Sequence, residues 1–433
     1  MSDNQLSGGE TRSDNPNAKS TTNRTKQNAH QSLYKLQYSN QHYIVYGMDC
    51  SYFTQKLVFA LHYTGLRYSC SKKSIQSNQK QIEMRAGTHM VPILHTPDQW
   101  IIHDTTPLLH LISSRLSATT PKLYPMGIVG VVSAVMEEYF DEYWTRIGVH
   151  MRWNYPDCAN VVCNRLGIDT VDTNDISDNV VRQAAERIKY WGQYRAVVSL
   201  GIDNSNPNAQ LQMECEIWDV LSQLDKHIES HPYILGRYAT SVDCIVLGSL
   251  HAHFLRDPEP LNRFRVLPTL YKWYVANCNL LPSVKQPNRI VESYQWINQT
   301  TSIDMTDYVI DTPFVHYLLH VMSGCYRDMI RSNMIAVQHK QKTFTTQLTA
   351  KHSLQHRGQS VQYRISAEQQ KQIHDVETTF YSRPLTVHSH DQLQHFIHTH
   401  IHNIDEIDQY NQLMQKSELY DLYGYQNQST SKL

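Results

Sequence analysis

The sequence has 433 residues, of which 40% are hydrophobic and 18% are charged, a composition typical of a globular protein with two or three domains. The formal net charge of −1 excludes the strongly basic surface of most nucleic-acid or anionic-membrane binders. No apolar run approaches the roughly 20 residues that span a bilayer, and the polar start lacks the apolar core of a signal peptide. The eight cysteines are dispersed, without a Cys-x-x-Cys pair. We therefore expect reduced thiols in a cytoplasmic protein, with no nucleic acid and no membrane among its partners.

The chain begins with a polar stretch and then changes to a pattern of short strands and helices. Residues 1–40 are rich in Asn, Ser, Thr, Gln and Gly, which predicts disorder. After that stretch, apolar alternation and helical spacing predict α/β structure, with Gly65 closing the first helix. The expected elements are a strand at 43–46, a helix at 53–63, a strand at 67–71 and a short helix at 75–85.

The apolar run at 90–94 contains Pro92, although proline donates no hydrogen bond to a strand ladder. A turn at 96–99 and a second short strand follow. Asp104 and Thr105 then stand where the next helix should begin, and we expect that helix over about 106–116. This layout can hold a small peptide by its backbone at one end and by its carboxylate at the other.

Beyond residue 121 the pattern is helical, which predicts an α-helical bundle. A capping box at Thr240–Asp243 precedes one of the apolar runs. The tail beyond residue 340 is dominated by Gln, His, Thr and Ser, and we expect short, loosely attached helices there. The predicted helical segments are 127–153, 175–198, 209–230, 244–254, 267–276, 312–338, 367–378, 391–402 and 406–416.

These motifs, in this order, resemble those of the glutathione S-transferase superfamily. The matching stretches are Tyr46-Gly47, Ser51–Leu57, Val91–Leu94, Asp104-Thr105, Leu235-Gly236 and Thr240–Asp243. Within the superfamily, the chain looks most similar to a poorly characterised, largely bacterial group with a C-terminal extension. The resemblance implies an α/β thioredoxin-like domain followed by an all-α helical bundle and a mostly helical extension. The expected boundaries are 1–40 for the disordered segment, 41–118, 122–282 and 283–433.

The resemblance also implies a glutathione site around the proline hairpin. In this superfamily the bond before the matching proline is cis, and Val91 would offer its N–H and C=O to the cysteinyl backbone of glutathione. Asp104 and Thr105 would hold the γ-glutamyl end at a helix N-terminus, where free N–H groups favour a carboxylate. The alternative is that Pro92 only shapes an edge strand and Asp104 only caps a helix.

Two neighbouring residues, Ser51 and Cys50, are candidates for the residue that acts on the thiol. The enzyme must stabilise the thiolate of glutathione, and Ser51 aligns with the serine that does so in the superfamily. Cys50 precedes it and suggests the branches that form a mixed disulfide, although the proline that usually follows such a cysteine is absent. A third possibility is that neither residue acts. Met90 is a further departure, because many relatives carry a basic or amide residue there.

A second-substrate cleft is expected along the helix at 127–153. Polar residues repeat every four positions along this helix, and such a stripe usually forms a solvated face with ion pairs. The neighbouring aromatic side chains favour instead a cleft for an apolar electrophile. The stripe is Glu138, Glu142, Arg146 and His150, with Tyr139, Tyr143, Trp144 and Trp153 beside it. The expected cleft residues are Tyr139, Tyr143, Trp144 and His150.

The function that these features predict is a glutathione-dependent transferase that acts on an electrophilic small molecule, with glutathione as co-substrate. The alternatives are a non-catalytic binding module of the same fold and a thiol-disulfide oxidoreductase using Cys50. Relatives are commonly dimers, so a homodimer is expected. His395, His398 and His402 would share a helix face, but the tail is His-rich throughout and no metal site is predicted.

Overall fold

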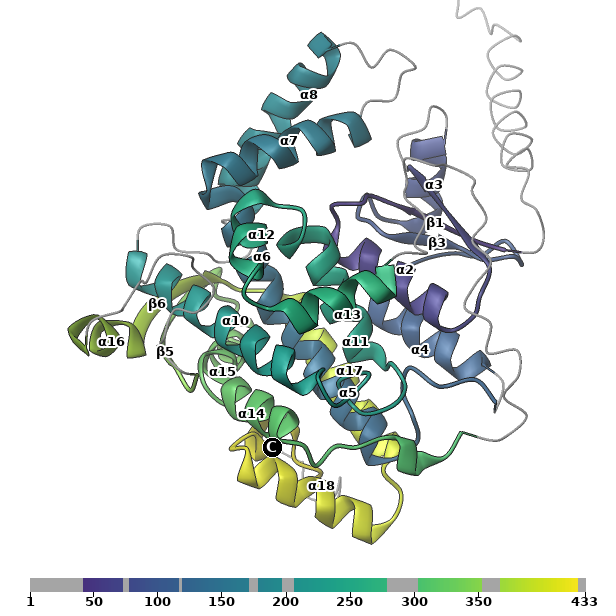
Figure 1. Ribbon diagram of the computed structural model, residues 1–433, viewed down its shortest axis with the longest axis vertical. Coiled ribbons are helices and arrows are strands. Elements are labelled where there is room, and N and C mark those ends of the chain that lie inside the picture. Colours follow the sequence, from purple (N-terminus) through teal and green to yellow (C-terminus); the bar gives the residue numbers. More distant parts are fainter. Residues whose placement is uncertain are drawn as a thin grey trace, which may run out of the picture. The chain divides into compact units, whose positions relative to one another are not determined.

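The computed structural model describes residues 42–72, 78–116, 119–170, 178–196, 206–278, 303–352 and 367–426 (Figure 1). The segment 1–40, for which disorder is predicted, lies outside these residues. No helix in the described ranges combines the length and the apolar character needed to cross a membrane.

The N-terminal region is an α/β unit built on one four-stranded sheet. The strand order is β2-β1-β3-β4, with β1 parallel to β2 and antiparallel to β3, and β3 antiparallel to β4. The arrangement is thioredoxin-like, as predicted. The strands are β1 Tyr43–Gly47, β2 Tyr68–Lys72, β3 Ile93–His95 and β4 Ile101–His103, and the helices are α2 Tyr52–Tyr63, α3 Asn78–Ala86 and α4 Thr105–Arg115.

Two local predictions are confirmed in this region, and one boundary moves. The Val91–Pro92 peptide bond is cis. Gly65, with φ of 80°, follows the C-terminal end of α2 as expected, a backbone conformation that glycine adopts without a Cβ clash. The apolar run at 90–94 enters the ladder only at Ile93, because Pro92 has no N–H to donate.

The middle of the chain is helical. The predicted helix at 127–153 is observed as α5, a π-helical turn and α6 in succession, whereas α7 and α12 were not predicted. The capping box is confirmed, since the Asp243 carboxylate accepts from the Thr240 N–H at 2.8 Å. The elements are α5 Ile128–Tyr139, η1 Phe140–Trp144, α6 Thr145–Asn154, α7 Pro156–Thr170, α8 Asp178–Tyr190, η2 Trp191–Ala196, α10 Pro207–His227, α11 Ser241–Ser249, η3 Leu250–Phe254, α12 Pro258–Phe264 and α13 Pro268–Cys278.

The C-terminal extension is mostly helical, as predicted, but it also contains an antiparallel strand pair, β5 and β6, that was not predicted. The predicted helix at 312–338 is two helices that break at Ser323-Gly324. His402 lies beyond the end of α17, so it shares no helix face with His395 and His398. The elements are η4 Met305–Asp307, α14 Pro313–Met322, α15 Cys325–Gln338, β5 Thr343–Thr349, α16 Ala367–His374, β6 Asp375–Tyr381, α17 Pro384–His400, α18 Ile404–Lys416 and α19 Tyr420–Tyr423.

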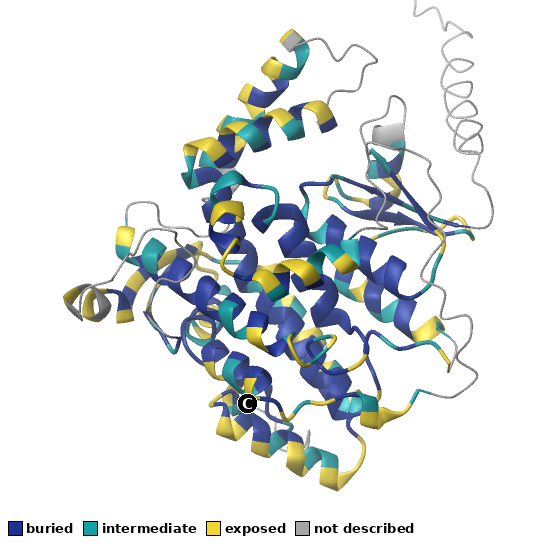
Figure 2. Cartoon of the chain, viewed as in Figure 1, coloured by how far each residue is buried: buried dark blue, intermediate teal, exposed yellow. Residues whose placement is uncertain are grey.

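One large hydrophobic core joins residues from all three regions (Figure 2). Helices α2 and α11 can approach closely because residue 248 is a glycine. A Cβ at this position would lie only 2.7 Å from the backbone nitrogen of Lys56. The extension contributes fully buried side chains such as Ile397, Tyr410 and Tyr423. The prediction of loosely attached tail helices is therefore wrong for the described part of the extension.

Candidate functional site

The strand register brings three sequence-predicted residues to one end of the sheet. Tyr46 pairs with Ile93, and Ile93 pairs with His103. The end of β1, the start of β3 and the end of β4 therefore lie at the same edge. Ser51 follows β1 after a short loop, Val91 precedes β3, and Asp104 follows β4 directly, so the chain offers all three at this edge.

Ser51 is the N-cap of α2, and its Oγ accepts the Thr54 N–H at 3.2 Å. That bond uses a lone pair of the oxygen and leaves the hydroxyl proton free to donate elsewhere. The side chain is partly exposed and sits at the positive end of a helix dipole. Ser51 is thus suited to donate a hydrogen bond to an anion that binds at this edge.

The loop before Ser51 is held close to α2. Gly47 packs against Thr54 so tightly that a Cβ would lie 2.3 Å from the threonine methyl group. The Ser51 N–H also donates to the Met48 carbonyl at 3.0 Å. These contacts fix the position of the serine relative to β1.

Val91 presents a backbone with free hydrogen-bonding groups. It lies before the first ladder pair of β3, and within the described ranges its N–H and C=O make no hydrogen bond. The residue is partly exposed. A free donor and a free acceptor on one extended residue are what a bound peptide backbone can pair with.

Asp104 occupies the N-cap position of α4 in a conformation unfavourable for a non-glycine residue, with φ of 74° and ψ of 118°. Its exposed carboxylate makes no capping hydrogen bond. The Asp104 side chain therefore contributes no capping hydrogen bond to α4. Residues held in such conformations concentrate at functional sites. Thr105, the first residue of α4, is buried.

Cys50 has the opposite properties from a reactive cysteine. Its side chain is 3% exposed, and burial raises the pKa of its thiol, whereas nucleophilic cysteines are accessible and have lowered pKa values. Its carbonyl accepts a hydrogen bond from the buried Arg152 at 2.8 Å, and Arg152 pairs with Asp257 at 3.0 Å. Cys50 is part of the packing that supports the loop.

A buried charge cluster that the sequence interpretation missed anchors the start of α4. Lys56, fully buried on α2, places its Nζ 2.6 Å from both Glu137 and Asp141 and 3.1 Å from the Thr106 hydroxyl. Burial opposes ionisation of both acids. Lys56 nevertheless lowers the pKa of Glu137, while the pKa of Asp141 is raised to about 7. The one feature of the sequence that could have indicated this cluster is the single lysine within the apolar run of α2.

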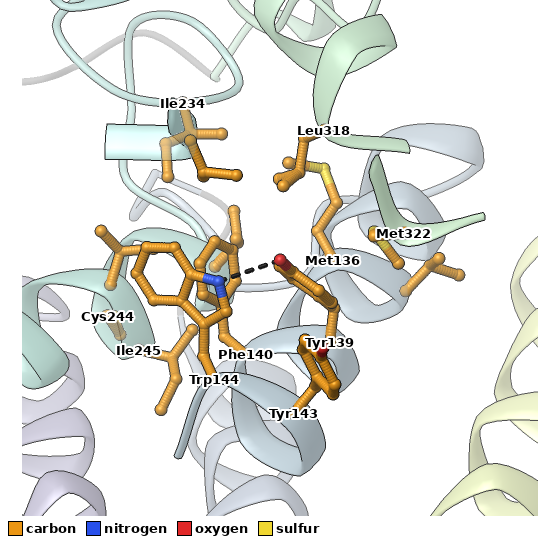
Figure 3. Packing of buried hydrophobic residues seen from close by; sticks show 14 of the residues in the cluster. Met136, Tyr139, Phe140, Tyr143, Trp144, Ile234, Cys244, Ile245, Leu318 and Met322 are labelled. Atoms are coloured by element: carbon orange, nitrogen blue, oxygen red, sulfur yellow. Dashed lines mark hydrogen bonds between the residues drawn. The ribbon is translucent and has the colours of Figure 1, made fainter. Parts of the chain in front are cut away.

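The predicted aromatic cleft is not a surface in this structure. Figure 3 shows Tyr139 and Trp144 packed among Ile234, Cys244 and Leu318, with the Trp144 Nε1 donating to the Tyr139 hydroxyl. The interpretation as an exposed cleft wall is wrong, because none of the four side chains is more than 2% exposed. The four are Tyr139, Tyr143, Trp144 and His150.

The polar stripe is not a solvated face either, because the extension covers it. The Glu138 carboxylate accepts from the hydroxyls of Tyr423 at 2.6 Å and Tyr326 at 3.2 Å. Glu142 accepts from the Thr386 hydroxyl at the start of α17. The sequence could not reveal this, since the covering residues lie almost 200 positions or more along the chain. His150, further along, bonds to Glu214 of α10 at 3.0 Å.

The sheet edge itself is not covered by the described part of the extension. Among the ring contacts of the extension, the one nearest to the edge is on α4. There Phe396 of α17 packs against His110, with ring centroids 4.5 Å apart. At 1.5 Å per residue, His110 lies about 9 Å along the helix from Asp104. Ser51 and Val91 stay partly exposed and Asp104 stays exposed.

Comparison with known proteins gives one family and several distant structures. Residues 45–119 match the family model described as glutathione S-transferase, N-terminal domain. A rice glutathione S-transferase in complex with glutathione is 13% identical, with 57% of this chain and 94% of that chain covered and a TM-score of 0.36. A theta-class enzyme from Xanthomonas axonopodis pv. citri with glutathione bound is also 13% identical, with 55% and 92% covered and a TM-score of 0.31. No curated protein matches the chain.

The family match covers the stretch that carries the edge described above. It includes the end of β1, Ser51, the cis Val91–Pro92 bond and Asp104. The thioredoxin-like sheet and the mostly helical region after it agree with that match. Residues 45–119 of this chain are therefore similar to the N-terminal domain of the glutathione S-transferases.

Proposed function

We propose that the chain is a glutathione-dependent transferase whose glutathione site lies at the sheet edge formed by Ser51, Val91 and Asp104. The observation that carries the proposal is the unpaired backbone of Val91 beside the strained, uncapped Asp104. The cysteinyl backbone of glutathione pairs with Val91. The γ-glutamyl end binds at Asp104 and Thr105, where the N–H groups of α4 attract its carboxylate.

Ser51 stabilises the thiolate in this proposal. Its hydroxyl donates a hydrogen bond to the sulfur anion, and the α2 dipole lowers the thiol pKa further. The sulfur then attacks an electrophilic carbon, a carbon–sulfur bond forms, and the leaving group departs with its electron pair. The thiol proton goes to solvent. The cytoplasmic location, the homodimer and the domain boundaries stay predictions.

The test combines calorimetry with reduced glutathione at millimolar concentration and a conjugation assay with a chlorodinitrobenzene electrophile. Because a hydrogen bond to a charged group contributes about 1.5–3 kcal/mol, we expect Ser51→Ala to lower kcat by roughly tenfold or more and to raise the thiol pKa in the pH–rate profile. Ser114→Ala, an exposed serine on α4, is the matched control and leaves both unchanged.

Each alternative gives its own result. If glutathione produces heat but no conjugation occurs, the fold serves as a binding module. If Ser51→Ala conjugates at the original rate, Ser51 does not stabilise the thiolate. If Cys50→Ser abolishes thiol–disulfide exchange while Ser51→Ala does not, the oxidoreductase alternative holds. Absence of heat at millimolar glutathione overturns the site altogether.

A further inference from the structure

A second polar site lies where the extension meets the polar stripe, and its centre is Arg146 of α6. This arginine is 2% exposed. Its Nε donates to the Glu142 carbonyl at 3.3 Å, and its guanidinium lies 4.7 Å from the centre of the Phe380 ring. Its Nη1 has no hydrogen-bond partner among the described residues. A buried guanidinium with an unmet donor is costly unless something pairs with it.

The charges around Arg146 do not balance. The charged groups that act on it are Arg383, at the N-cap of α17, and Glu142. Glu142 lies 3.5 Å from the Arg383 Nη1. Two positive groups thus face one carboxylate, and burial with Arg383 nearby lowers the pKa of Arg146 to about 9. One positive charge is left without a counterion in the described ranges.

Unpaired hydroxyls lie on the same face of β6 as the ring that covers Arg146. Burial alternates along β6 with Thr378 and Phe380 inward, and Ser382 continues this period of two. The Thr378 Oγ1 and the Ser382 Oγ are buried without hydrogen-bond partners in the described chain. They lie on opposite sides of Phe380 and are about 13 Å apart along the strand, and Ser382 is the one adjacent to Arg383.

The backbone of Arg383 is held in place by a buried side chain. The buried Asn333 of α15 accepts its N–H at 2.8 Å and donates to its C=O at 3.1 Å. This two-point clamp fixes the start of α17, whose free N–H groups add positive potential. Arg383 is partly exposed, so the cluster reaches solvent on that side.

We propose that Arg146, Arg383 and Ser382 form a binding site for a small oxyanion, a phosphate group or a carboxylate, between α6 and the extension. The anion supplies the counterion that Arg146 lacks and accepts from the Ser382 hydroxyl. A planar guanidinium suits both kinds of oxyanion. This site is separate from the proposed glutathione site and does not depend on it.

The test titrates the full chain with sodium phosphate and, separately, with sodium acetate at constant ionic strength, using calorimetry and melting temperature. We expect saturable binding of at least one anion, weakened tenfold or more by Arg146→Met. Arg331→Met, which removes an exposed arginine of the extension, is the control and binds as wild type. Asp104→Asn also binds as wild type, which separates this site from the glutathione site.

Ser382→Ala keeps Arg146 and covers the case in which Arg146→Met fails to fold; it too weakens binding. Saturation by phosphate alone identifies a phosphate site, and saturation by acetate alone identifies a carboxylate site. The proposal is overturned if neither anion gives saturable heat, or if Arg146→Met or Ser382→Ala binds as tightly as wild type.

Discussion

Asp104 is the residue whose backbone and side chain point most directly to a ligand. Its positive φ costs of order 1–3 kcal/mol for a non-glycine residue. Its carboxylate does not offset this cost, because it makes no capping hydrogen bond to α4. The strain is understandable if the side chain serves a bound molecule. Stability and binding should therefore respond in opposite directions to substitution here.

We expect Asp104→Gly to melt at the same temperature as the wild type or higher, because glycine lacks a Cβ and tolerates a positive φ at lower cost. The same variant should bind glutathione at least tenfold more weakly in calorimetry, since the carboxylate is gone. Asp104→Asn is the companion variant: it tolerates the backbone but lacks the charge, and it should weaken binding similarly. Wild-type glutathione affinity in both variants would contradict a binding role.

At this scale the sequence was informative where chemistry is local. The proline, the acid at a helix start and the serine cap were all recognisable, because each acts through its own backbone neighbourhood. Lys56 and Arg152 were not recognised, since their partners Glu137 and Asp257 lie about 80 and 105 positions away. A single sequence does not show which distant charges meet.

Helix α4 is the element on which the proposed site most depends. Its first turn carries Thr105, a residue of the proposed site, and Thr106, whose hydroxyl bonds to Lys56 and to Asp141 of η1. The π-helical turn η1 also supplies the Phe140 carbonyl that accepts from the Tyr52 hydroxyl at 3.0 Å. Helices α2 and α4 are thereby fastened to the same point of the helical region.

Replacing Lys56 with methionine should remove this anchor. Two buried acids would lose their cation, and breaking such a buried cluster costs about 3–5 kcal/mol, so we expect a clear drop in melting temperature at pH 7. Surviving folded protein should also show a raised KM for glutathione, because α4 is no longer held.

Lys351→Met is the control for that loss, because it breaks an exposed ion pair with Glu418 and should change stability by less than about 1 kcal/mol. The second comparison is Lys56→Met with Glu137→Gln and Asp141→Asn, which should recover much of the loss by removing the unpaired charges. An equal loss in the triple variant would mean that packing, not charge, is what Lys56 provides.

Element types were largely predictable, and their junctions were not. Helical spacing and turn residues located most helices in the described ranges. The break at Ser323-Gly324 was missed because the apolar stripe continues through it, and Gly324 is instead required by the nearby Thr349 carbonyl, 2.6 Å from a Cβ placed there. The β5–β6 pair was missed because its strands lie in a polar, His- and Gln-rich tail, where period-two alternation is weak.

On the scale of the whole molecule, the extension is part of the core. The polar stripe is therefore buried by the extension and does not face solvent or a substrate. Side chains expected to face water or a substrate are instead enclosed between the helical region and residues beyond 313. The cost of enclosing them is reduced by hydroxyl partners such as Tyr326 and Tyr423 on Glu138. Stability should consequently depend on pH along this interface.

Glu216 of α10 is the clearest case at this interface. Its Oε1 accepts from the Tyr139 hydroxyl at 2.5 Å, its Oε2 lies 3.8 Å from the Nε2 of His352, and burial raises its pKa to about 8. A carboxyl whose folded pKa is raised contributes stability that is fully present below its unfolded pKa of about 4.5. That stability is lost as the pH rises through the folded pKa.

We therefore expect the melting temperature of the wild type to fall as the pH rises from about 5 to 8.5, and Glu216→Gln to flatten part of that fall. The amide still accepts from Tyr139 but cannot ionise, so the variant should be the more stable protein at pH 8.5, by about 1–4 kcal/mol. Asp243, buried and with a pKa raised to about 6, and Asp141 add to the slope in both proteins. The difference between the two melting curves isolates Glu216. A difference that is constant across this pH range would show that folding does not raise the pKa of Glu216.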